Sequence, residues 1–402
     1  MDDIASKAVQ YHKTNRGKIA ITSVVPVDNK DDLSLAYTPG VAAVSKEIAA
    51  HPDKAYDLTW RGRTVAVVSD GSAVLGLGNI GPLAALPVME GKALLLKQYG
   101  GVDAVPIVIN TQDPSGIIEF VKQISPSFAG INLEDISAPR CFQVEEALQH
   151  VGIPVFHDDQ HGTAIVVRAA LHNAARVVGK RYEDLHVVIV GAGAAGLAIA
   201  KMLLGMNCNA ESCSRIAHAE SIKDLIIVDK HGAIYAGRED QNVYKQAIAA
   251  VSNTGKRRGS LLDIIEGADA IIGVSGPNTI SPEMVRRMNK DAIVFALANP
   301  TPEIMPDLAI EAGAAIVATG RSDLPNQINN VLAFPGVFRA VINGKLKQIT
   351  QEMKLAASNA LIELTPNPTN SHIIPDAFTP HLAEYVASAI LKHISAGTLK
   401  KM

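Results

Sequence analysis

The sequence predicts an α/β protein with a doubly wound parallel sheet and a second α/β domain before it. Short apolar segments alternate with helical segments over most of the 402 residues, which is typical of parallel sheets with crossover helices. A glycine-rich motif joins one such strand to a helix at residues 191–196. Pairs of acidic residues directly follow two other apolar segments, at 134–135 and 158–159. Together these three observations indicate a two-domain protein whose ligands bind where parallel strands end.

Composition narrows the class of function. Hydrophobic residues make up 48% of the chain, and 37 basic residues against 40 acidic ones give a net charge of −3. This balance, with only 4% aromatic residues, argues against a nucleic-acid or membrane surface. The N-terminus lacks the apolar core of a signal peptide, and the longest apolar run, 187–200, is too short to span a bilayer. We therefore expect a cytoplasmic protein whose three cysteines, Cys141, Cys208 and Cys213, are reduced thiols.

The N-terminal part begins with a short helix at residues 4–13 and reaches a Pro-Gly turn preceded by Tyr37. Such a tyrosine either packs against its neighbours or directs its hydroxyl into a cleft as a proton donor. A buried strand follows at 64–71, and after it Lys92 lies in an apolar helical segment. Lys92 is either a surface lysine or a partly buried one, and burial beside acids would tune its pKa for use as a base.

Gly76, Gly78 and Gly81 between that strand and Lys92 form a G-x-G-x-x-G pattern. We reject it as a dinucleotide motif because Pro82 and Pro87 interrupt the helix that should begin there. The glycines are better explained by a close approach of the backbone to a neighbouring segment or a ligand.

The two acidic pairs predict a metal site. Glu134 and Asp135 end the segment FAGINLED, and Asp158 and Asp159 end IPVFHDD, so both pairs follow a predicted buried strand. Either pair alone could be an ordinary cap or turn. At a shared sheet edge, however, four carboxylates would repel one another unless a hard dication such as Mg²⁺ or Mn²⁺ joined them.

The second half contains the dinucleotide motif. A long helix from Thr163 ends at Gly179, and a strand then leads into Gly191, Ala194, Ala195 and the helix beyond. With Gly193 and Gly196 the motif follows VVIV and precedes an amphipathic helix, the context of a Rossmann fingerprint that places pyrophosphate at a helix N-terminus. This is a strong prediction of a nucleotide-binding sheet.

Asp229 ends the next strand, where an acid binds the adenosine ribose. Its distance from the motif exceeds the usual spacing, and Lys230 beside it leaves a 2′-phosphate possible.

Further strands are predicted at 268–276, 291–300 and 314–320. Asn299 follows one of them and Asn330 lies in a later loop; either could form turns or offer amides to a carboxylate. Helices near 344–364 and 381–395 are expected to return to the first domain. The predicted domains are therefore 1–164, 165–340 and a helical segment, 341–402.

Taken together, these motifs resemble the malic enzymes, in particular the short bacterial type, from about residue 10 to about 390. The likeness is carried by AYTPGVA (36–42), SDGSAVLGLGNIGPLAALPVMEGK (69–92), INLEDISAPRCF (131–142), FHDDQHGTA (156–164), GAGAAG (191–196), FALANPTPEI (295–304) and NQINNVLAFPGVFRA (326–340). The family oxidises L-malate with NAD(P)⁺ and decarboxylates the product to pyruvate and CO₂. The resemblance also implies a homodimer.

The resemblance assigns roles to single residues. It implies that Glu134, Asp135 and Asp159 hold Mg²⁺ or Mn²⁺, and that Lys92, beside Asp158, takes the hydroxyl proton of malate. Tyr37 would protonate C3 of enolpyruvate. It further implies that Asn299 and Asn330 bind the substrate and the nicotinamide. We expect NAD⁺ as the first cofactor, because Asp229 would repel the 2′-phosphate of NADP⁺.

Two departures from longer relatives stand out. Animal malic enzymes carry a substrate-binding arginine before LGLG, where this chain has Ser72-Ala73-Val74, so another group must bind that carboxylate. The C-terminal phosphotransacetylase-like domain of some bacterial members is also not expected. Two alternatives stay open: a malolactic enzyme, which makes lactate and retains its cofactor, and a catalytically silent NAD-binding regulator.

Overall fold

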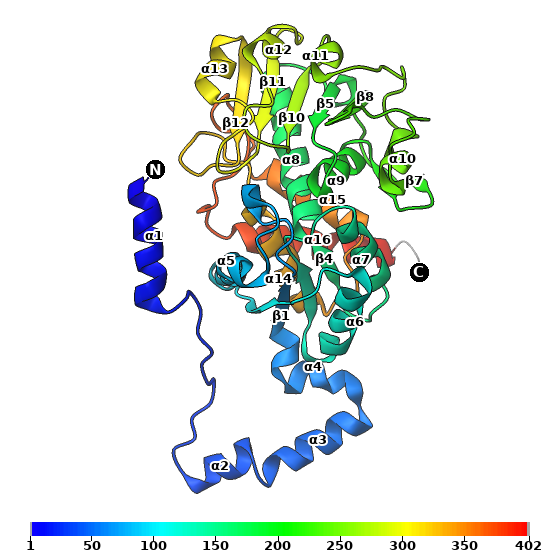
Figure 1. The fold of residues 1–402 in the computed structure, drawn as a ribbon. Coiled ribbons are helices and arrows are strands. Elements are labelled where there is room, and N and C mark those ends of the chain that lie inside the picture. The colour runs from blue at the N-terminus through cyan, green and yellow to red at the C-terminus, as the bar shows by residue number, and fades with distance from the viewer. Residues whose placement is uncertain (1, 400–402) are drawn as a thin grey trace.

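A computed structural model of the chain describes residues 2–399. Two parallel sheets lie one above the other, joined by the long helix α8 (Asp158–Val177) and by helices from the C-terminal part of the chain (Figure 1). No helix among the described residues is long and apolar enough to cross a membrane.

The first sheet consists of four parallel strands in the order β2-β1-β3-β4. The chain lays down β1 and β2 and then returns to the other side of β1, so the strand order reverses between β1 and β3. Ligands bind at such a reversal in open α/β sheets. Its strands are β1 (Thr64–Ser69), β2 (Asp103–Val108), β3 (Gly130–Leu133) and β4 (Val155–His157), and its helices are α5 (Pro82–Gly100), α6 (Pro114–Ile124) and α7 (Arg140–Leu148).

The second sheet has six strands in the order β12-β11-β10-β5-β8-β9, of which only the short edge strand β9 is antiparallel. Every predicted strand of this half is present, and the doubly wound class is confirmed. Strands are β5 (His186–Val190), β8 (Asp224–Asp229), β9 (Gly232–Ala233), β10 (Ala270–Gly273), β11 (Ala292–Ala296) and β12 (Ala314–Thr319); helices are α9 (Ala194–Leu203), α10 (Val243–Ala249), α11 (Leu261–Ile264), α12 (Pro282–Arg286) and α13 (Pro306–Glu311).

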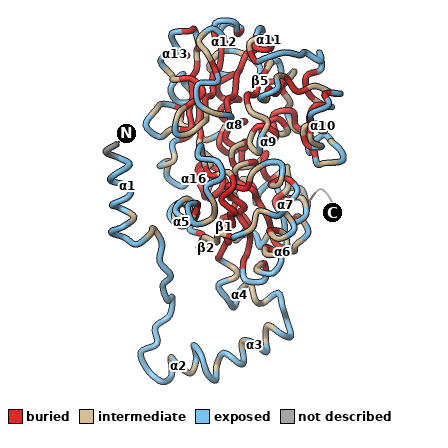
Figure 2. The backbone as a smooth tube through the Cα atoms, in the orientation of Figure 1, coloured by how far each residue is buried: buried red, intermediate tan, exposed pale blue. Residues whose placement is uncertain are grey.

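The last three helices pack on the rest of the chain; the second and third of them lie where helices were predicted near 344–364 and 381–395, and the first was not predicted. Helix α14 (Phe334–Gly344) packs on α5, α15 (Gln351–Glu363) packs on α8, and α16 (Leu382–Leu399) contacts both α14 and α15. One hydrophobic core runs through the first sheet, these helices and one face of the second sheet, while the other face of the second sheet has its own core. The two halves are therefore held in one packed unit, shown as the continuous buried region of Figure 2.

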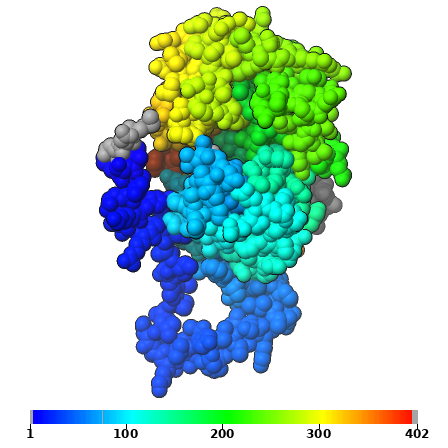
Figure 3. Space-filling model, viewed as in Figure 1, coloured from blue at the N-terminus to red at the C-terminus, as the bar shows by residue number. Residues whose placement is uncertain are grey.

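The N-terminal segment is largely exposed. It contacts this unit where Lys18 donates to Glu90 of α5 and where Tyr56 donates to a carbonyl of α14. Helices α1 (Asp2–Asn15), α2 (Lys30–Ala36), α3 (Gly40–Ala50) and α4 (Ala55–Leu58) form an extended arm that leaves the body of the protein (Figures 1 and 3). No described side chain from Ile4 to Arg63 is buried. We call residues 2–63 the N-terminal arm.

Two sequence expectations were wrong. Pro82 and Pro87 do not interrupt a helix: α5 begins at Pro82 and contains Pro87. Pro82 occupies the first turn, where its missing N–H costs nothing, and the carbonyl that loses its partner to Pro87 belongs to Leu83, which is exposed.

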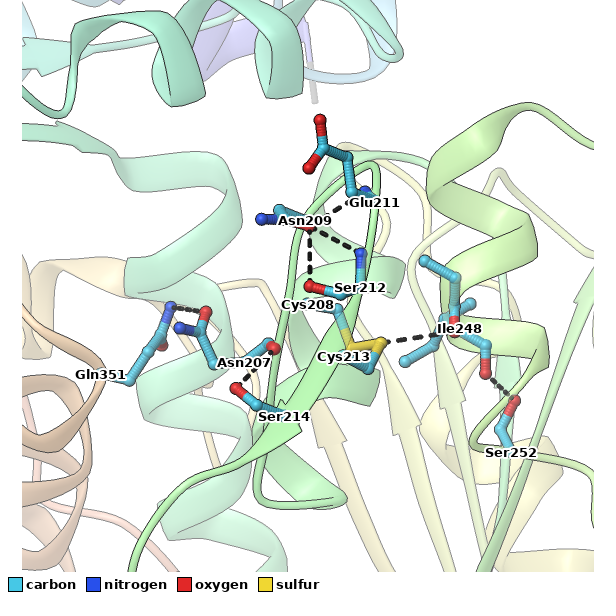
Figure 4. The surroundings of a disulfide bond; sticks show 11 residues. Asn207, Cys208, Asn209, Glu211, Ser212, Cys213, Ser214, Ile248, Ser252 and Gln351 are labelled. Carbon is cyan, nitrogen blue, oxygen red and sulfur yellow. Dashed lines mark hydrogen bonds between the residues drawn. A yellow bond between two sulfur atoms is a disulfide. The ribbon is translucent and has the colours of Figure 1, made fainter.

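The second concerns the cysteines. Cys208 and Cys213 are not free thiols but form a disulfide across the hairpin of β6 (Met206–Cys208) and β7 (Cys213–Arg215) (Figure 4). The two residues pair directly in the antiparallel register, which brings their sulfurs together although the sequence gives only their spacing. Cys141 is a buried free thiol.

Candidate active site

The two acidic pairs meet at one edge of the first sheet. Strands β3 and β4 are parallel neighbours in which Leu133 pairs with His157, so the residues that follow them lie side by side. Asp158 and Asp159 also form the first turn of α8, where the positive end of the helix dipole favours carboxylates. The prediction that the pairs converge at a strand end is confirmed.

Three carboxylates form a set that could hold a metal ion. One oxygen each from Glu134, Asp135 and Asp159 lies within 4.8 Å of the others. Asp159 accepts a hydrogen bond from the backbone N–H of Asp135 at 2.8 Å, and Asn132 donates to Glu134 at 2.7 Å. These contacts fix the carboxylates before any ion arrives.

The charge at this set needs a cation. Burial raises the pKa of the Asp159 carboxyl to about 6, against the attraction of Lys92, and it also raises the pKa of Glu134. Carboxylates with raised pKa values resist ionising together. A hard dication would supply the missing positive charge and prefers oxygen ligands, so the residues present fit Mg²⁺ or Mn²⁺.

Lys92 reaches into the same edge from α5. Its Nζ lies 2.6 Å from Asp158 Oδ2 and 2.9 Å from Glu134 Oε1, and it stands 4.3 Å above the ring of Phe334. Burial disfavours its ammonium, but the attraction of Asp158 and Glu134 outweighs this and raises the pKa of Lys92. Burial in turn raises the pKa of Asp158 to about 7, in spite of Lys92. The lysine is therefore a buried site residue, not a surface one.

Asn330 borders this site, whereas Asn299 lies against the glycine loop at 76–81. Asn330 begins a short 3-10 helix and lies beside Asp158 at Gly162, where an added Cβ would be 1.9 Å from Asp158 Oδ1 and 3.1 Å from Asn330 Cβ. Asn299 follows β11, and its carbonyl oxygen would lie 2.0 Å from a Cβ on Gly76. The backbone of the G-x-G-x-x-G loop at 76–81 therefore passes close to a neighbouring segment, as expected, and that segment belongs to the second domain.

The dinucleotide motif has the predicted local structure. Gly191 follows β5 with φ of +116°, and a Cβ there would lie 2.5 Å from the carbonyl oxygen of Val274. Gly196 packs closer still, since a Cβ there would lie 1.9 Å from the oxygen of Gly191, whereas nothing lies within 4 Å of a Cβ on Gly193. Ala194 and Ala195 begin α9. The motif therefore combines a tight turn with an open approach to a helix N-terminus, as pyrophosphate binding requires.

Asp229 ends β8 next to this motif but is already engaged. Its carboxylate accepts hydrogen bonds from Arg238 at 2.6 and 3.0 Å, from Lys245 at 2.6 Å and from the backbone of His231 at 2.9 Å. Burial opposes the charge, but these donors hold the pKa of Asp229 well below its usual range. Lys230 is exposed. The sequence placed the acid correctly but gave no sign of its two cationic partners.

Tyr37 lies apart from the other predicted residues. It caps the C-terminus of α2 on the N-terminal arm, and 67% of its surface is exposed. Figure 1 places α2 at the far end of the arm, away from α5 and β4. The structure thus brings Lys92, the acids and Asn330 together but does not bring Tyr37 of the same chain to them.

Comparison with known proteins identifies the family. Residues 15–116 match the family described as malic enzyme, N-terminal domain, and residues 160–394 match malic enzyme, NAD binding domain. The chain belongs to the malic enzyme family. It is 52% identical to an NAD-dependent malic enzyme of Geobacillus stearothermophilus over 94% of this chain and 76% of that protein. It is 50% identical to a bifunctional malic/malolactic enzyme of Bacillus subtilis, over 97% and 92% of the two chains.

Solved structures agree with this assignment. The crystal structure of the malic enzyme from Pyrococcus horikoshii superposes with a TM-score of 0.90 at 44% identity, covering 98% of this chain and 91% of that one. The superposition covers nearly the whole chain, so it includes both sheets and the NAD-binding domain of this malic enzyme.

Sequence reasoning missed several residues of the malic enzyme site. Asn132, which holds Glu134, is a fully buried polar residue in an apolar strand. Its spacing of two from Glu134 puts both on one strand face, a signal that could have been used. Phe334, which covers Lys92, and the partners of Asp229 come from distant segments and have no local sequence signal.

Proposed function

We propose residue roles for the reaction of this malic enzyme, the oxidation of malate with NAD(P)⁺ and its decarboxylation to pyruvate and CO₂. The observation that carries them is the contact of Lys92 with Asp158 and Glu134 directly beside the three-carboxylate set. A buried amine, a proton acceptor and a site suited to a dication thus share one sheet edge.

Glu134, Asp135 and Asp159 would hold Mg²⁺ or Mn²⁺. When bound, the ion supplies Lewis acidity that stabilises negative charge on the substrate oxygen during oxidation and decarboxylation. Asn132 keeps Glu134 turned toward the set, and the backbone of Asp135 does the same for Asp159. The protein thereby orients its carboxylates in advance.

Lys92 would accept the proton of the malate hydroxyl. Its ammonium must first lose a proton, and Asp158 is the acceptor in contact with it, at 2.6 Å. The carboxylates of Asp158 and Glu134 oppose this loss because they raise the pKa of Lys92. A dication on Glu134 would weaken that attraction and so favour the neutral amine. Phe334 covers the amine and limits its access to water.

The amide groups of Asn299 and Asn330 would bind substrate and nicotinamide at the edge of the second sheet. NAD(P)⁺, bound along Gly191, Gly193 and Gly196, supplies the hydride acceptor. We keep NAD⁺ as the first cofactor. Arg238 and Lys245 neutralise Asp229, so Asp229 should repel a 2′-phosphate less than a free carboxylate would. We therefore expect the enzyme to use NADP⁺ less efficiently than NAD⁺, but still to use it.

Tyr37 would serve as the proton donor to C3 in the site of a second copy of the chain, in a homodimer. The support is the N-terminal arm: it buries none of its described side chains and exposes large apolar ones, which marks an interaction surface. Those at least half exposed are Ile4, Val9, Tyr11, Ile21, Val24, Val25, Val27, Leu33, Leu35 and Tyr37. If two copies exchanged arms reciprocally, each would cover the exposed apolar side chains of the other and supply Tyr37 to its site.

The test of these roles is Lys92→Ala. Loss of the general base should lower kcat by roughly 10²–10⁴-fold while leaving the affinity for NAD⁺, measured by fluorescence titration, unchanged. Lys97→Ala is the matched control, because Lys97 lies on the same helix but is exposed, and its ion-pair partner among the described residues is Asp103. Unchanged turnover in Lys92→Ala would show that another group is the base.

A malolactic reaction is the second candidate, favoured by the 50% identity to the bifunctional Bacillus subtilis enzyme. Assays of the wild-type protein with malate and Mn²⁺ should follow absorbance at 340 nm, pyruvate and lactate together, with NAD⁺ and with NADP⁺. We expect pyruvate with matching reduced cofactor, and a higher kcat/KM with NAD⁺. Lactate without an absorbance rise would identify the malolactic reaction instead. A silent regulator would show neither product, and the complete set of acids with Lys92 argues against it.

A further inference from the structure

A cavity of about 810 Å³ lies apart from the strand ends that carry Lys92, Asp158 and the three carboxylates, which we call the catalytic edge from their proposed role. It lies between α7, α8, α9, the β6–β7 hairpin and the start of α15, and neither Lys92 nor any of the three proposed metal ligands lines it. We call it the α15 pocket. Its volume is in the range of small-molecule sites. Gln351 of α15 donates a hydrogen bond to Asn207 of the hairpin at 3.4 Å and closes one side (Figure 4).

Lys354 in the second turn of α15 is the unusual residue of this pocket. It lines the cavity although only 5% of its surface is exposed. Among the described residues its ammonium has no hydrogen-bond or ion-pair partner, and its one ring contact is with Phe156, at 6.0 Å. A buried ammonium without a counter-ion is costly, and burial lowers the pKa of Lys354 to about 8.

The nearby charges do not satisfy Lys354. Glu145 attracts Lys354, but its oxygens are engaged by Gln160 at 3.0 Å and His161 at 2.6 Å. Lys201 of α9 lines the same pocket, repels Lys354, and likewise has no ion pair in the described part of the chain. Its ammonium stands 5.7 Å from the Phe142 ring. Glu145 attracts both ammonium groups and Glu146 attracts Lys201, but no described carboxylate lies within ion-pair distance of either lysine.

Other charged residues lie further out. Arg215 and Glu211 of the hairpin region line the pocket but are exposed, Glu352 is half-buried, and Glu146 accepts a hydrogen bond from Tyr244 at 3.2 Å. The wall of the pocket is thus mixed in charge, whereas Lys354, its most buried cation, has no ion-pair partner among the described residues. Anions should be drawn to the inner part of the pocket, near the two lysines.

We propose that the α15 pocket is a binding site for a small organic anion whose phosphate or carboxylate group lies between Lys354 and Lys201. The site is independent of the malate site and of the dinucleotide motif. The cavity has room for a body larger than the anionic group itself, which the walls of α7 and α9 would contact. A single oxyanion would satisfy both ammonium groups in one step.

The test uses the full chain with EDTA and saturating NAD⁺, so that neither metal nor the dinucleotide motif can capture the probe. Inorganic phosphate and, in a second arm, acetate are titrated at pH 7 and constant ionic strength, with binding followed by calorimetry and by Tm. We expect saturable binding and a rise in Tm for the wild type, with a Kd at least ~10-fold weaker in Lys354→Met. The arm that binds more tightly distinguishes a phosphate site from a carboxylate site.

Lys347→Met is the matched control, because Lys347 is exposed on the segment just before α15 and should bind both probes as the wild type does. Without probe, Lys354→Met should have the same Tm as the wild type or a higher one, since it removes an uncompensated charge. If that variant does not fold, Lys201→Met takes its place. The proposal is overturned if the wild type binds neither probe saturably, or if the folded lysine variant binds both as tightly as the wild type.

Discussion

At the scale of single residues, the buried acids of the catalytic edge should lower the stability of the metal-free protein by a measurable amount. The pKa of Asp159 is raised by burial to about 6 from an ordinary value of 3.8. Between these two values the folded protein binds more protons than the unfolded chain, so this group's contribution to stability is fully present at low pH and is lost as the pH rises. Once a dication is bound, the ionised carboxylate of Asp159 would instead stabilise the folded protein.

This sign gives a testable pH dependence. In EDTA, the Tm of the wild type relative to that of Asp159→Asn should fall as the pH rises from about 4 to 6, because asparagine cannot ionise. With saturating Mn²⁺ the fall should be reduced or reversed. Thermal unfolding of both proteins across this pH range measures the difference. A wild-type Tm that rises relative to the variant in EDTA would contradict the raised pKa.

At the scale of elements, the sequence was a good guide to regular structure. Buried parallel strands appear as short apolar runs, and the glycine motif at 191–196 lies where a strand meets a helix, so both sheets could be predicted. The catalytic edge was predictable too, because the residues after parallel strands converge whatever the rest of the fold does.

What could not be predicted depends on how segments fold against one another, even where they are close in the sequence. Arg238 and Lys245 come to Asp229 through the turn and helix that follow β8, and the Cys208–Cys213 pair follows from the register of one hairpin. The position of Tyr37 depends on where the N-terminal arm goes, which its own helical pattern does not determine. Local sequence patterns determine where helices and strands form, but they do not determine which of them come into contact.

The first turn of α8 offers a prediction at this scale. Gly162 leaves room for the Asp158 carboxylate, since an added Cβ would lie 1.9 Å from Oδ1. Gly162→Ala should displace Asp158 from Lys92 and lower kcat at least ~10-fold, an effect of more than about 1.4 kcal/mol on the barrier.

Gly91→Ala on α5 is the control for that substitution. Its nearest neighbour is the flexible end of Lys18 at 3.4 Å, so it should retain activity and gain some helix stability. Steady-state kinetics and circular dichroism of both variants give the comparison. Full activity in Gly162→Ala would mean that the position of Asp158 is not critical.

At the scale of the whole molecule, the proposed exchange of N-terminal arms between two copies of the chain can be tested by complementation. If Tyr37 acts in the partner's site, an inactive Tyr37→Phe chain and an inactive Lys92→Ala chain should complement each other. In a mixed dimer one site receives an intact Lys92 and an intact Tyr37. Random 1:1 mixing should then restore about a quarter of wild-type activity, since half of the dimers carry one good site of two.

Co-expression with two affinity tags isolates the mixed dimer, and sedimentation confirms its size. Tyr37→Phe mixed with the wild type controls for simple dilution. Were Tyr37 to act within its own chain, every site of the mixed dimer would carry one defect and the activity would stay at the level of the single variants.

The central claim, that Glu134, Asp135 and Asp159 bind one divalent ion beside Lys92, is tested most directly by Mn²⁺ titration of EDTA-treated protein, followed by calorimetry or electron paramagnetic resonance. One Mn²⁺ per chain should bind, Asp159→Asn should weaken the affinity by roughly 10–100-fold or more, and Asp307→Asn, an exposed acid of α13, should leave it unchanged. Equal Mn²⁺ affinity in the wild type and in Asp159→Asn would contradict the account.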